Sequence, residues 1–445
     1  MLRRHLAFRA SFVGAAALGL AACEAHPSSD VADVRAAPAE NWERDVESTA
    51  LDVDLATKRA TATVRFASSP RRGGSLEVGD LAIDRVRDTS GRDVRFAVRD
   101  GQLDLAIAAK KPVEVTIDYA FGTHTKLEGW TKNGVTFLWP HFCGNLFPCK
   151  SDPADGVRFT LDVHDATLAP GESLVFASEI PADAPSYMLA WARGAYTHQA
   201  LGTTRAGTRV GLYHLPGESK SAAQGVEPLV DAFDWLESTY GAYTFGGEVA
   251  SVSAPWGEGA FGGMEHHPYW HVASDAMNDP ETHVHEAAHG WFGDGVRIAC
   301  WEDLVLSEGT TSYVTARAIE AVRGTSAGYA VWADYEARLD AVIASEDRVA
   351  WPAVVDGERR CNAIDVLGEL WNDVPYMKGA FFLRAVEGAV GREAIDAALR
   401  AFYTEHVGEA ASMSDLFATI EAETGFDPGP LADAWLARMG RPDAP

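Results

Sequence analysis

The most informative residues of the sequence are two histidines with a glutamate between them, His285, Glu286 and His289, followed by Glu308. Histidines four apart on a helix lie about 40° apart around its axis, so both imidazoles can reach one metal ion. Glu286 cannot share that direction with both, so it suits a general base better than a ligand. Glu308, from a second helix, would be the third ligand and leave one position of a single Zn²⁺ open to water. The spacing predicts zinc-dependent hydrolysis.

The residues around this group predict the helix that must carry it. Asp279 suits the N-cap, Pro280 the first helical position and Glu281 the first turn. We expect a helix over 280–292, ended by Gly293. Nearby histidines lack their own i, i+4 partner around a glutamate and are expected to be pocket or surface residues rather than ligands. They are His266, His267, His271 and His283.

Four segments around these residues resemble the gluzincin aminopeptidases, the family of aminopeptidase N and leukotriene A4 hydrolase. Residues 285–309, HEAAHGWFGDGVRIACWEDLVLSEG, are similar to the family's zinc block, HExxHxWFGNxVxxxxWxDLWLNEG. Residues 262–266, GGMEH, resemble its G-x-M-E-N exopeptidase motif, with His in place of Asn. Residues 374–379, VPYMKG, resemble its Y-x-K-G motif, and residues 147–163 resemble a segment near the end of its first β domain. The segments also follow the family's order.

This resemblance implies roles for residues outside the zinc motif. Tyr376 would stabilise the oxyanion, although a packing role is the alternative. Glu265 would pair with the free α-ammonium of a peptide substrate. Protonated His266 would compete for Glu265 at low pH. Asp303 would hold a ligand histidine by its other ring nitrogen, or else cap a helix. The substrate-binding segment as a whole is Gly262, Gly263, Met264, Glu265 and His266.

The function that these residues predict is an aminopeptidase that removes N-terminal residues from peptides. A zinc endopeptidase of the thermolysin type is one alternative, because it would share the ligands but would not need Glu265. A non-catalytic peptide-binding lipoprotein on the same scaffold is another, and it would be expected to have lost Glu286 or a ligand.

The N-terminus predicts export and a lipid anchor. Arg3, Arg4 and Arg9 precede a short apolar run at 10–20, too short to span a membrane unaided. Residues 20–23, LAAC, look like a bacterial lipobox, so residues 1–22 would be a signal peptide and Cys23 the lipidated residue. An ordinary cleaved signal peptide is the alternative. Residues 23–41 resemble a flexible tether. We expect a protein of the bacterial cell envelope that faces the periplasm or exterior and reaches the membrane only through this anchor.

The net charge limits the classes of partner, and the cysteine content suggests disulfide bonds. A formal net charge of −26 excludes a nucleic-acid binder. Four further cysteines, an even number in an exported chain, suggest two disulfides with three possible pairings. We favour Cys143–Cys149, which closes a short loop, and Cys300–Cys361, since both lie in the catalytic half.

The length and pattern predict an α+β multidomain chain. Short alternating segments such as 50–55, 62–66 and 113–119 indicate an N-terminal β saddle or sandwich over 42–204. Helical patterns dominate residues 205–445, which the resemblance implies to be a thermolysin-like peptidase domain. Beyond 280–292 we expect helices at 304–323, 375–386, 393–406, 412–424 and 430–439. The family's C-terminal β module and helical solenoid have no counterpart before Pro445, so a short form is expected. The oligomeric state is not predicted.

Overall fold

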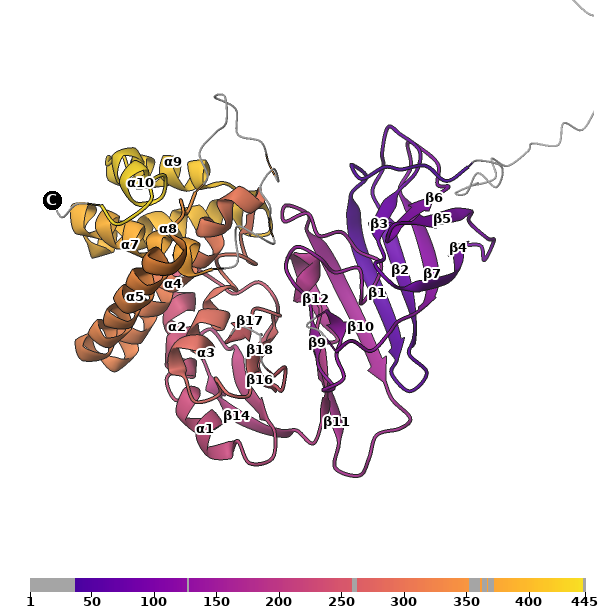
Figure 1. Ribbon diagram of the computed structural model, residues 1–445, viewed down its shortest axis with the longest axis horizontal. Coiled ribbons are helices and arrows are strands. Elements are labelled where there is room, and N and C mark those ends of the chain that lie inside the picture. The colour runs from indigo at the N-terminus through magenta and orange to yellow at the C-terminus, as the bar shows by residue number, and fades with distance from the viewer. Residues whose placement is uncertain are drawn as a thin grey trace, which may run out of the picture.

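The computed structural model describes residues 37–125, 128–257, 262–351, 361, 366 and 372–442. Strands dominate the N-terminal part and helices the C-terminal part (Figure 1). The predicted fold class, an N-terminal β domain followed by a mainly helical catalytic domain, is confirmed. Residues 1–22, Cys23 and most of the predicted tether lie outside the described residues.

The N-terminal part is built on a six-stranded sheet. Its strands alternate apolar and polar residues, and in β1 buried Leu51 and Val53 flank exposed Asp52, so one face packs on the core. β1 pairs antiparallel with β2 and parallel with β10. In spatial order the strands are β12 (Glu179–Ala184), β10 (Val157–His164), β1 (Val46–Asp54), β2 (Arg59–Phe66), β7 (Val113–Ala120) and β4 (Ala82–Asp88).

Small sheets complete this part. They are β3 (Ser75–Glu77) with β6 (Gln102–Leu105) and β5 (Phe96–Arg99), β11 (Ser173–Phe176) with β13 (Trp191–Gly194), and β8 (Gly129–Trp130) with β9 (Thr136–Phe137). Cys143 and Cys149 are joined by a disulfide, and the Glu77 amide donates to the Cys149 carbonyl at 2.8 Å. Asn41 is buried and its side chain donates to Ser69, so the fold already includes the last residues of the predicted tether.

A five-stranded sheet begins the second part. In order it contains β14 (Thr197–Thr203), β15 (Arg209–His214), β16 (Glu248–Ala254), β18 (Tyr269–Ala273) and β17 (Gly263–Met264). The predicted boundary between residues 204 and 205 is therefore too late, because β14 pairs antiparallel with β15. An alternating strand pattern does not say which sheet the strand will join.

Helices build most of the remainder. They are α1 (Ser219–Gly225), α2 (Leu229–Tyr240), α3 (Pro280–Ala288), α4 (Leu304–Arg323), α5 (Thr325–Glu346), α7 (Asp373–Val390), α8 (Arg392–His406), α9 (Met413–Thr424) and α10 (Gly429–Trp435). A short 3₁₀ turn, η2 (Trp301–Asp303), and a small parallel pair of strands, β19 (Arg297–Ile298) and β20 (Ala410–Ala411), lie among them. Another 3₁₀ turn, η1 (Ser186–Met188), belongs to the N-terminal part, between β12 and β13. Among the described helices, none has the length and apolarity that a membrane crossing requires.

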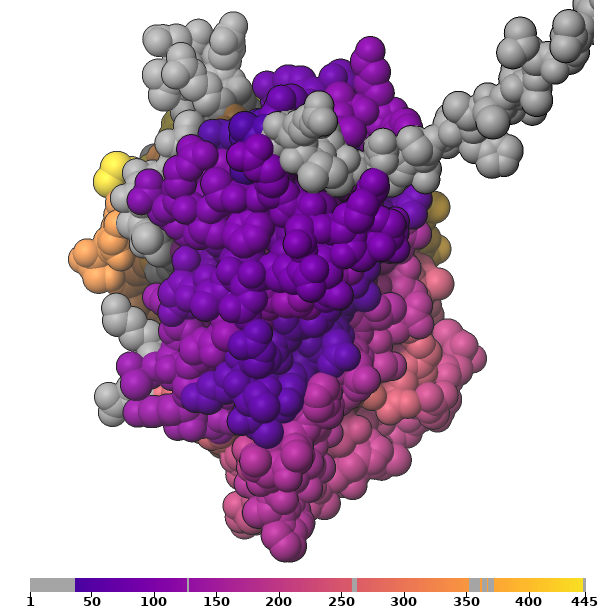
Figure 2. All heavy atoms as spheres, turned by 90° about the vertical axis from the view of Figure 1, so that its right-hand side faces the viewer, coloured from indigo at the N-terminus to yellow at the C-terminus, as the bar shows by residue number. Residues whose placement is uncertain are grey.

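The two parts are docked against each other. Viewed from the β side, the N-terminal part covers much of the molecule (Figure 2). Side chains cross the boundary to backbone carbonyls: Arg297 donates to Asp183 at 2.8 Å, Trp256 to Thr136 at 3.1 Å, and Tyr196 to Ser253 at 2.8 Å. These hydrogen bonds fix the β part beside the catalytic residues.

Candidate zinc site

The helix that carries the two histidines starts as its sequence predicts and ends earlier. The Asp279 carboxylate accepts the Glu281 amide at 3.2 Å, and Pro280 is the first helical residue. The helix stops at Ala288 rather than Phe292, and the chain later turns at Gly293, whose φ is +111°. The Phe292 carbonyl therefore lies outside the helix.

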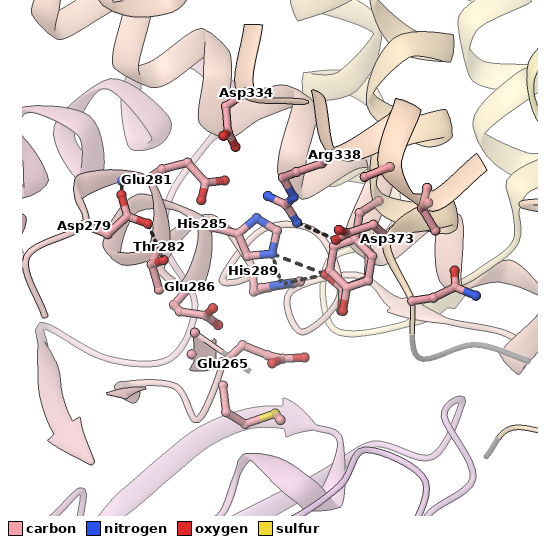
Figure 3. Close-up of a pocket in the computed structure, with 18 of the residues that line it drawn as sticks. Glu265, Asp279, Glu281, Thr282, His285, Glu286, His289, Asp334, Arg338 and Asp373 are labelled. Atoms are coloured by element: carbon pink, nitrogen blue, oxygen red, sulfur yellow. Dashed lines mark hydrogen bonds and ion pairs between the residues drawn. The ribbon is translucent and has the colours of Figure 1, made fainter. Parts of the chain in front are cut away.

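The three predicted ligands converge on one point, and Figure 3 shows two of them, His285 and His289, side by side in the pocket. The Nε2 atoms of His285 and His289 lie 3.1 Å apart, and each lies 3.3 Å from Glu308 Oε2. Tetrahedral zinc with bonds of about 2.0–2.1 Å separates its ligand atoms by about 3.3 Å, so this triangle fits Zn²⁺. Two facing imidazole nitrogens share at most one proton, whereas a cation between them satisfies both. The donor set therefore fits zinc.

The surrounding charges also favour a cation here. Burial opposes charge on His289, but the carboxylates of Glu308 and Glu265 raise its pKa well above the usual value. Burial would raise the pKa of Glu308, yet His289 and His285 lower it to about 2. Positive charge between the two histidines is thus stabilised by the acidic surroundings.

Glu286 lies beside this triangle and is not part of it. Its carboxylate packs against Gly263 on the edge strand β17, where the glycine leaves room for it. Burial, the largest cause, and the neighbouring Glu265 and Glu308 raise its pKa well above 4.5. A carboxylate with a raised pKa accepts a proton more readily, which suits the predicted general base.

The outer nitrogen of His289 is held by residues that the sequence did not single out. His289 Nδ1 lies 3.0 Å from the Phe292 carbonyl, and the Thr311 hydroxyl lies 3.3 Å from the same nitrogen. Thr311 also donates to the Phe292 carbonyl at 2.9 Å. Such partners fix the tautomer and orientation of a ligand histidine.

The role predicted for Asp303 is wrong. Its carboxylate accepts Trp351 Nε1 at 2.9 Å and the Met413 amide at 3.2 Å, so it supports the start of α9 rather than a ligand histidine. Asp303 also occupies the N-cap position of α4, where its side chain makes no capping hydrogen bond. The Phe292 carbonyl, which follows α3, is instead the partner of the outer nitrogen of His289. No sequence motif identifies a backbone carbonyl in this role.

A close crossing of α4 and α7 brings Tyr376 to the site. A Cβ added at Gly379 would lie 2.6 Å from Gly309 Cα, so only glycines permit this approach. Gly309 follows the ligand Glu308, and Tyr376 lies one turn before Gly379 on α7. The Tyr376 ring stacks on His285 with centroids 6.1 Å apart. Burial raises the pKa of Tyr376 well above 10, as do Glu308 and Glu265, so its hydroxyl keeps its proton.

The three predicted ligands, Glu286 and Tyr376 line a cavity of about 620 Å³. α5 and α7 contribute to its lining, and there Arg338 pairs with Asp373 at 2.7 Å (Figure 3). The substrate-binding segment predicted from sequence reaches it through Gly262, Gly263, Met264 and Glu265.

Glu265 is buried, and its position depends on a residue that the sequence analysis missed. The Tyr187 hydroxyl, on η1 of the β part, lies 2.8 Å from Glu265 Oε1 and 3.0 Å from Asp294 Oδ1. Asp294 is fully buried, and burial, with Glu265 nearby, raises its pKa well above 3.8.

The structure does not support the predicted role of His266 in substrate binding. Its ring lies outside the cavity lining and packs edge-to-face on His271, with centroids 4.9 Å apart. Neither ring nitrogen has a hydrogen-bond partner among the described residues. Burial, the largest cause, lowers the pKa of His266 well below 6.5, so a protonated His266 does not compete for Glu265 near neutral pH.

His267 and His283, expected to be pocket or surface residues, are instead buried outside the cavity lining and hydrogen-bonded to the fold. His267 bridges the Tyr243 hydroxyl and the Glu286 carbonyl, each at 2.8 Å. His283 bridges the Ser251 hydroxyl at 2.8 Å and the Met277 carbonyl at 3.1 Å. Beyond the site, Cys300 and Cys361 are disulfide-bonded, the pairing that the sequence favoured.

Known proteins are similar to this chain over the part that contains these residues. Residues 267–435 match the model of the peptidase family M1 domain. Aminopeptidase M1-B of Oryza sativa subsp. japonica is 26% identical over 435 residues, which are 86% of this chain and 48% of that protein. Tricorn protease-interacting factor F2 of Thermoplasma volcanium is 31% identical over 168 residues, 37% of this chain and 21% of that protein. The chain thus spans at most about half the length of these relatives.

Solved structures share the fold over most of the chain. An M1 zinc metallopeptidase from Deinococcus radiodurans superposes with a TM-score of 0.74 at 18% identity, covering 90% of this chain and 95% of that one. Native yeast LTA4 hydrolase gives 0.71 at 18% identity, covering 92% and 72%. The zinc motif lies inside the matched M1 domain, so the comparisons support the resemblance of this chain to the gluzincin M1 aminopeptidases.

Proposed function

We propose that this protein is a zinc-dependent aminopeptidase that removes N-terminal residues from peptides. His285, His289 and Glu308 would hold one Zn²⁺ per chain, since their ligand atoms form the triangle that tetrahedral zinc requires. When bound, the ion supplies Lewis-acid polarisation of the scissile carbonyl and lowers the pKa of water.

One observation carries the exopeptidase assignment: the buried carboxylate of Glu265 lies next to the catalytic group. Ligand-capable atoms of Glu265, Glu286 and His289 lie within 4.8 Å of one another. Consecutive Cα atoms in a peptide are about 3.8 Å apart, so an amine bound at Glu265 leaves room for about one residue before the scissile carbonyl. A peptide chain end fits this spacing, whereas an internal bond would strand a buried charge.

The remaining steps belong to residues of this chain. Glu286 accepts a proton from the attacking water and returns it to the leaving amine, in keeping with its raised pKa. The Tyr376 hydroxyl, which keeps its proton, donates to the oxygen that becomes negative as the tetrahedral intermediate forms. Glu265 holds the α-ammonium and sets which bond lies beside Glu286.

The test compares an aminoacyl arylamide with its N-acetylated form. A free amine should be preferred by more than about a hundredfold, because an unpaired buried carboxylate costs about 3 kcal/mol. Glu265→Ala should abolish most of that preference while zinc content is unchanged. Internal cleavage of N-acetylated peptides at the free-amine rate would instead establish an endopeptidase. No hydrolysis of either substrate by the zinc-loaded protein would favour a peptide-binding lipoprotein.

We also propose that Cys23 anchors the protein to the bacterial cell envelope through acyl chains. The support is the sequence alone: a basic start, a short apolar run and LAAC at 20–23. Cys23→Ser should move the protein from the membrane fraction to the aqueous fraction, because the variant cannot carry the proposed acyl chains. An unchanged distribution after fractionation would exclude this anchor.

A further inference from the structure

The Tyr187 hydroxyl reaches the substrate site from the other half of the molecule. It lies 78 residues before Glu265 in sequence, and the two residues come from different parts of the fold. Its contact with Glu265 Oε1 is 2.8 Å, within the range of a direct hydrogen bond. The catalytic part therefore does not contain everything that touches Glu265.

The surroundings of Tyr187 hold it in place. It is 8% exposed, and its neighbours on η1, Ser186 and Met188, are buried as well. Burial, followed by the charges of Asp294 and Glu265, raises the pKa of Tyr187 well above 10, so its hydroxyl stays protonated. A protonated hydroxyl beside a carboxylate is a hydrogen-bond donor.

Donation to Oε1 orients the whole carboxylate. A hydrogen bond to one oxygen restricts the orientations that the carboxylate can adopt, while its other oxygen can accept a substrate ammonium. Asp294 Oδ1 lies 3.0 Å from the same hydroxyl. Burial raises the pKa of Asp294, so its protonated form can donate to the Tyr187 oxygen and leave the hydroxyl proton to Glu265. Glu265 lines both the cavity and a smaller space next to it, whereas Tyr187 lines only the smaller space, whose lining does not include Glu286.

We propose that Tyr187 is a positioning residue for exopeptidase specificity: by donating to Glu265 it aims that carboxylate at the α-ammonium of the substrate. The inference rests on the proposed aminopeptidase function. It makes the β part a contributor to the amine site rather than only a support for the catalytic part.

The first experiment separates substrate binding from turnover. Tyr187→Phe keeps the ring and removes the hydroxyl, so KM for alanine p-nitroanilide should rise about tenfold or more while kcat changes less than about threefold. The preference over N-acetyl-alanine p-nitroanilide should fall by the same factor. Tyr196→Phe is the matched control, because its hydroxyl also crosses between the parts but donates to the Ser253 carbonyl, away from the site. Its KM should stay at the wild-type value.

A second experiment measures binding without turnover and tests the partner. On a Glu286→Gln background, alanine amide should bind about tenfold more weakly after Tyr187→Phe, as measured by calorimetry. In the presence of Glu265→Ala, Tyr187→Phe should have no further effect, as the double-mutant cycle requires if both act on one interaction. Should the Phe variant not fold, Tyr187→Met removes the same hydroxyl with a side chain that adapts to the space.

The outcomes are separable. An unchanged KM in Tyr187→Phe, a loss confined to kcat, or an additive effect in the Glu265→Ala background would overturn the role of Tyr187. If wild-type protein does not prefer the free amine, the aminopeptidase proposal itself fails. A wild-type preference that survives in Tyr187→Phe refutes only the inference about Tyr187.

Discussion

Gly379 is the residue whose replacement most directly tests how Tyr376 is positioned. It lies on α7 where that helix crosses α4, and an added Cβ would meet Gly309 Cα at 2.6 Å and Val305 Cγ2 at 2.8 Å. The first of these contacts is a backbone atom, which cannot rotate away. Gly379→Ala therefore requires the two helices to separate.

The size of the separation follows from the contact distance. Ordinary van der Waals contact begins at 3.4 Å, so the helices must move apart by about 0.8 Å. Tyr376 on α7 would then lie farther from Glu308 and His285 on the other side of the crossing. A misplacement of about 1 Å costs up to about a hundredfold in rate, and overpacking costs about 1–3 kcal/mol of stability. We expect kcat to fall about 10- to 100-fold, with zinc content unchanged.

The same helix provides a control. A Cβ at Gly388 would meet nothing within 4 Å, so Gly388→Ala should leave kcat unchanged and raise the free energy of unfolding by about 0.5–1 kcal/mol, because alanine favours the helix. Both variants are compared by arylamide kinetics, urea unfolding and metal analysis. Wild-type kcat and stability in Gly379→Ala would refute the reasoning, as would an equal fall in kcat in Gly388→Ala.

Three further predictions concern the metal site. His289→Ala or Glu308→Ala should lose zinc by elemental analysis, and full zinc in either would exclude that residue as a ligand. Glu286→Gln should keep zinc and stability but lose nearly all turnover, and retained kcat would mean that another group accepts the proton. Thr311→Val removes a hydroxyl 3.3 Å from the outer nitrogen of His289 and should weaken zinc binding about tenfold in a competitive chelator titration. Unchanged affinity would show that the Phe292 carbonyl alone suffices.

The parts of the site that could be predicted are those encoded by short spacing. The two histidines are one helical turn apart, and Asp279 caps their helix as the sequence indicates, so neither depends on distant segments. The capped helix at α9 likewise follows from Ser412 and Asp415, which form a capping box. The predicted helix at 304–323 also has the observed bounds of α4.

Other helices were missed although their pattern is present. In α2 the buried residues Leu229, Phe233, Leu236 and Tyr240 recur at helical spacing, as do the buried residues of α5. The interaction of Tyr187 with Glu265 is a different case. It depends on how two parts of the chain dock, and no local pattern around Tyr187 specifies the residue that it will contact.

Three glutamates in one buried site show why residue type alone does not assign a role. Glu308 faces two histidine nitrogens at 3.3 Å, which lower its pKa to about 2 and keep it ionised as a metal ligand requires. Burial and acidic neighbours raise the pKa of the Glu286 carboxylate, which suits it to accept a proton. Glu265 receives a hydrogen bond from the β part, which leaves its other oxygen for a cationic chain end. The proposed roles of ligand, base and amine anchor thus follow from the partners that each carboxylate meets in the folded chain.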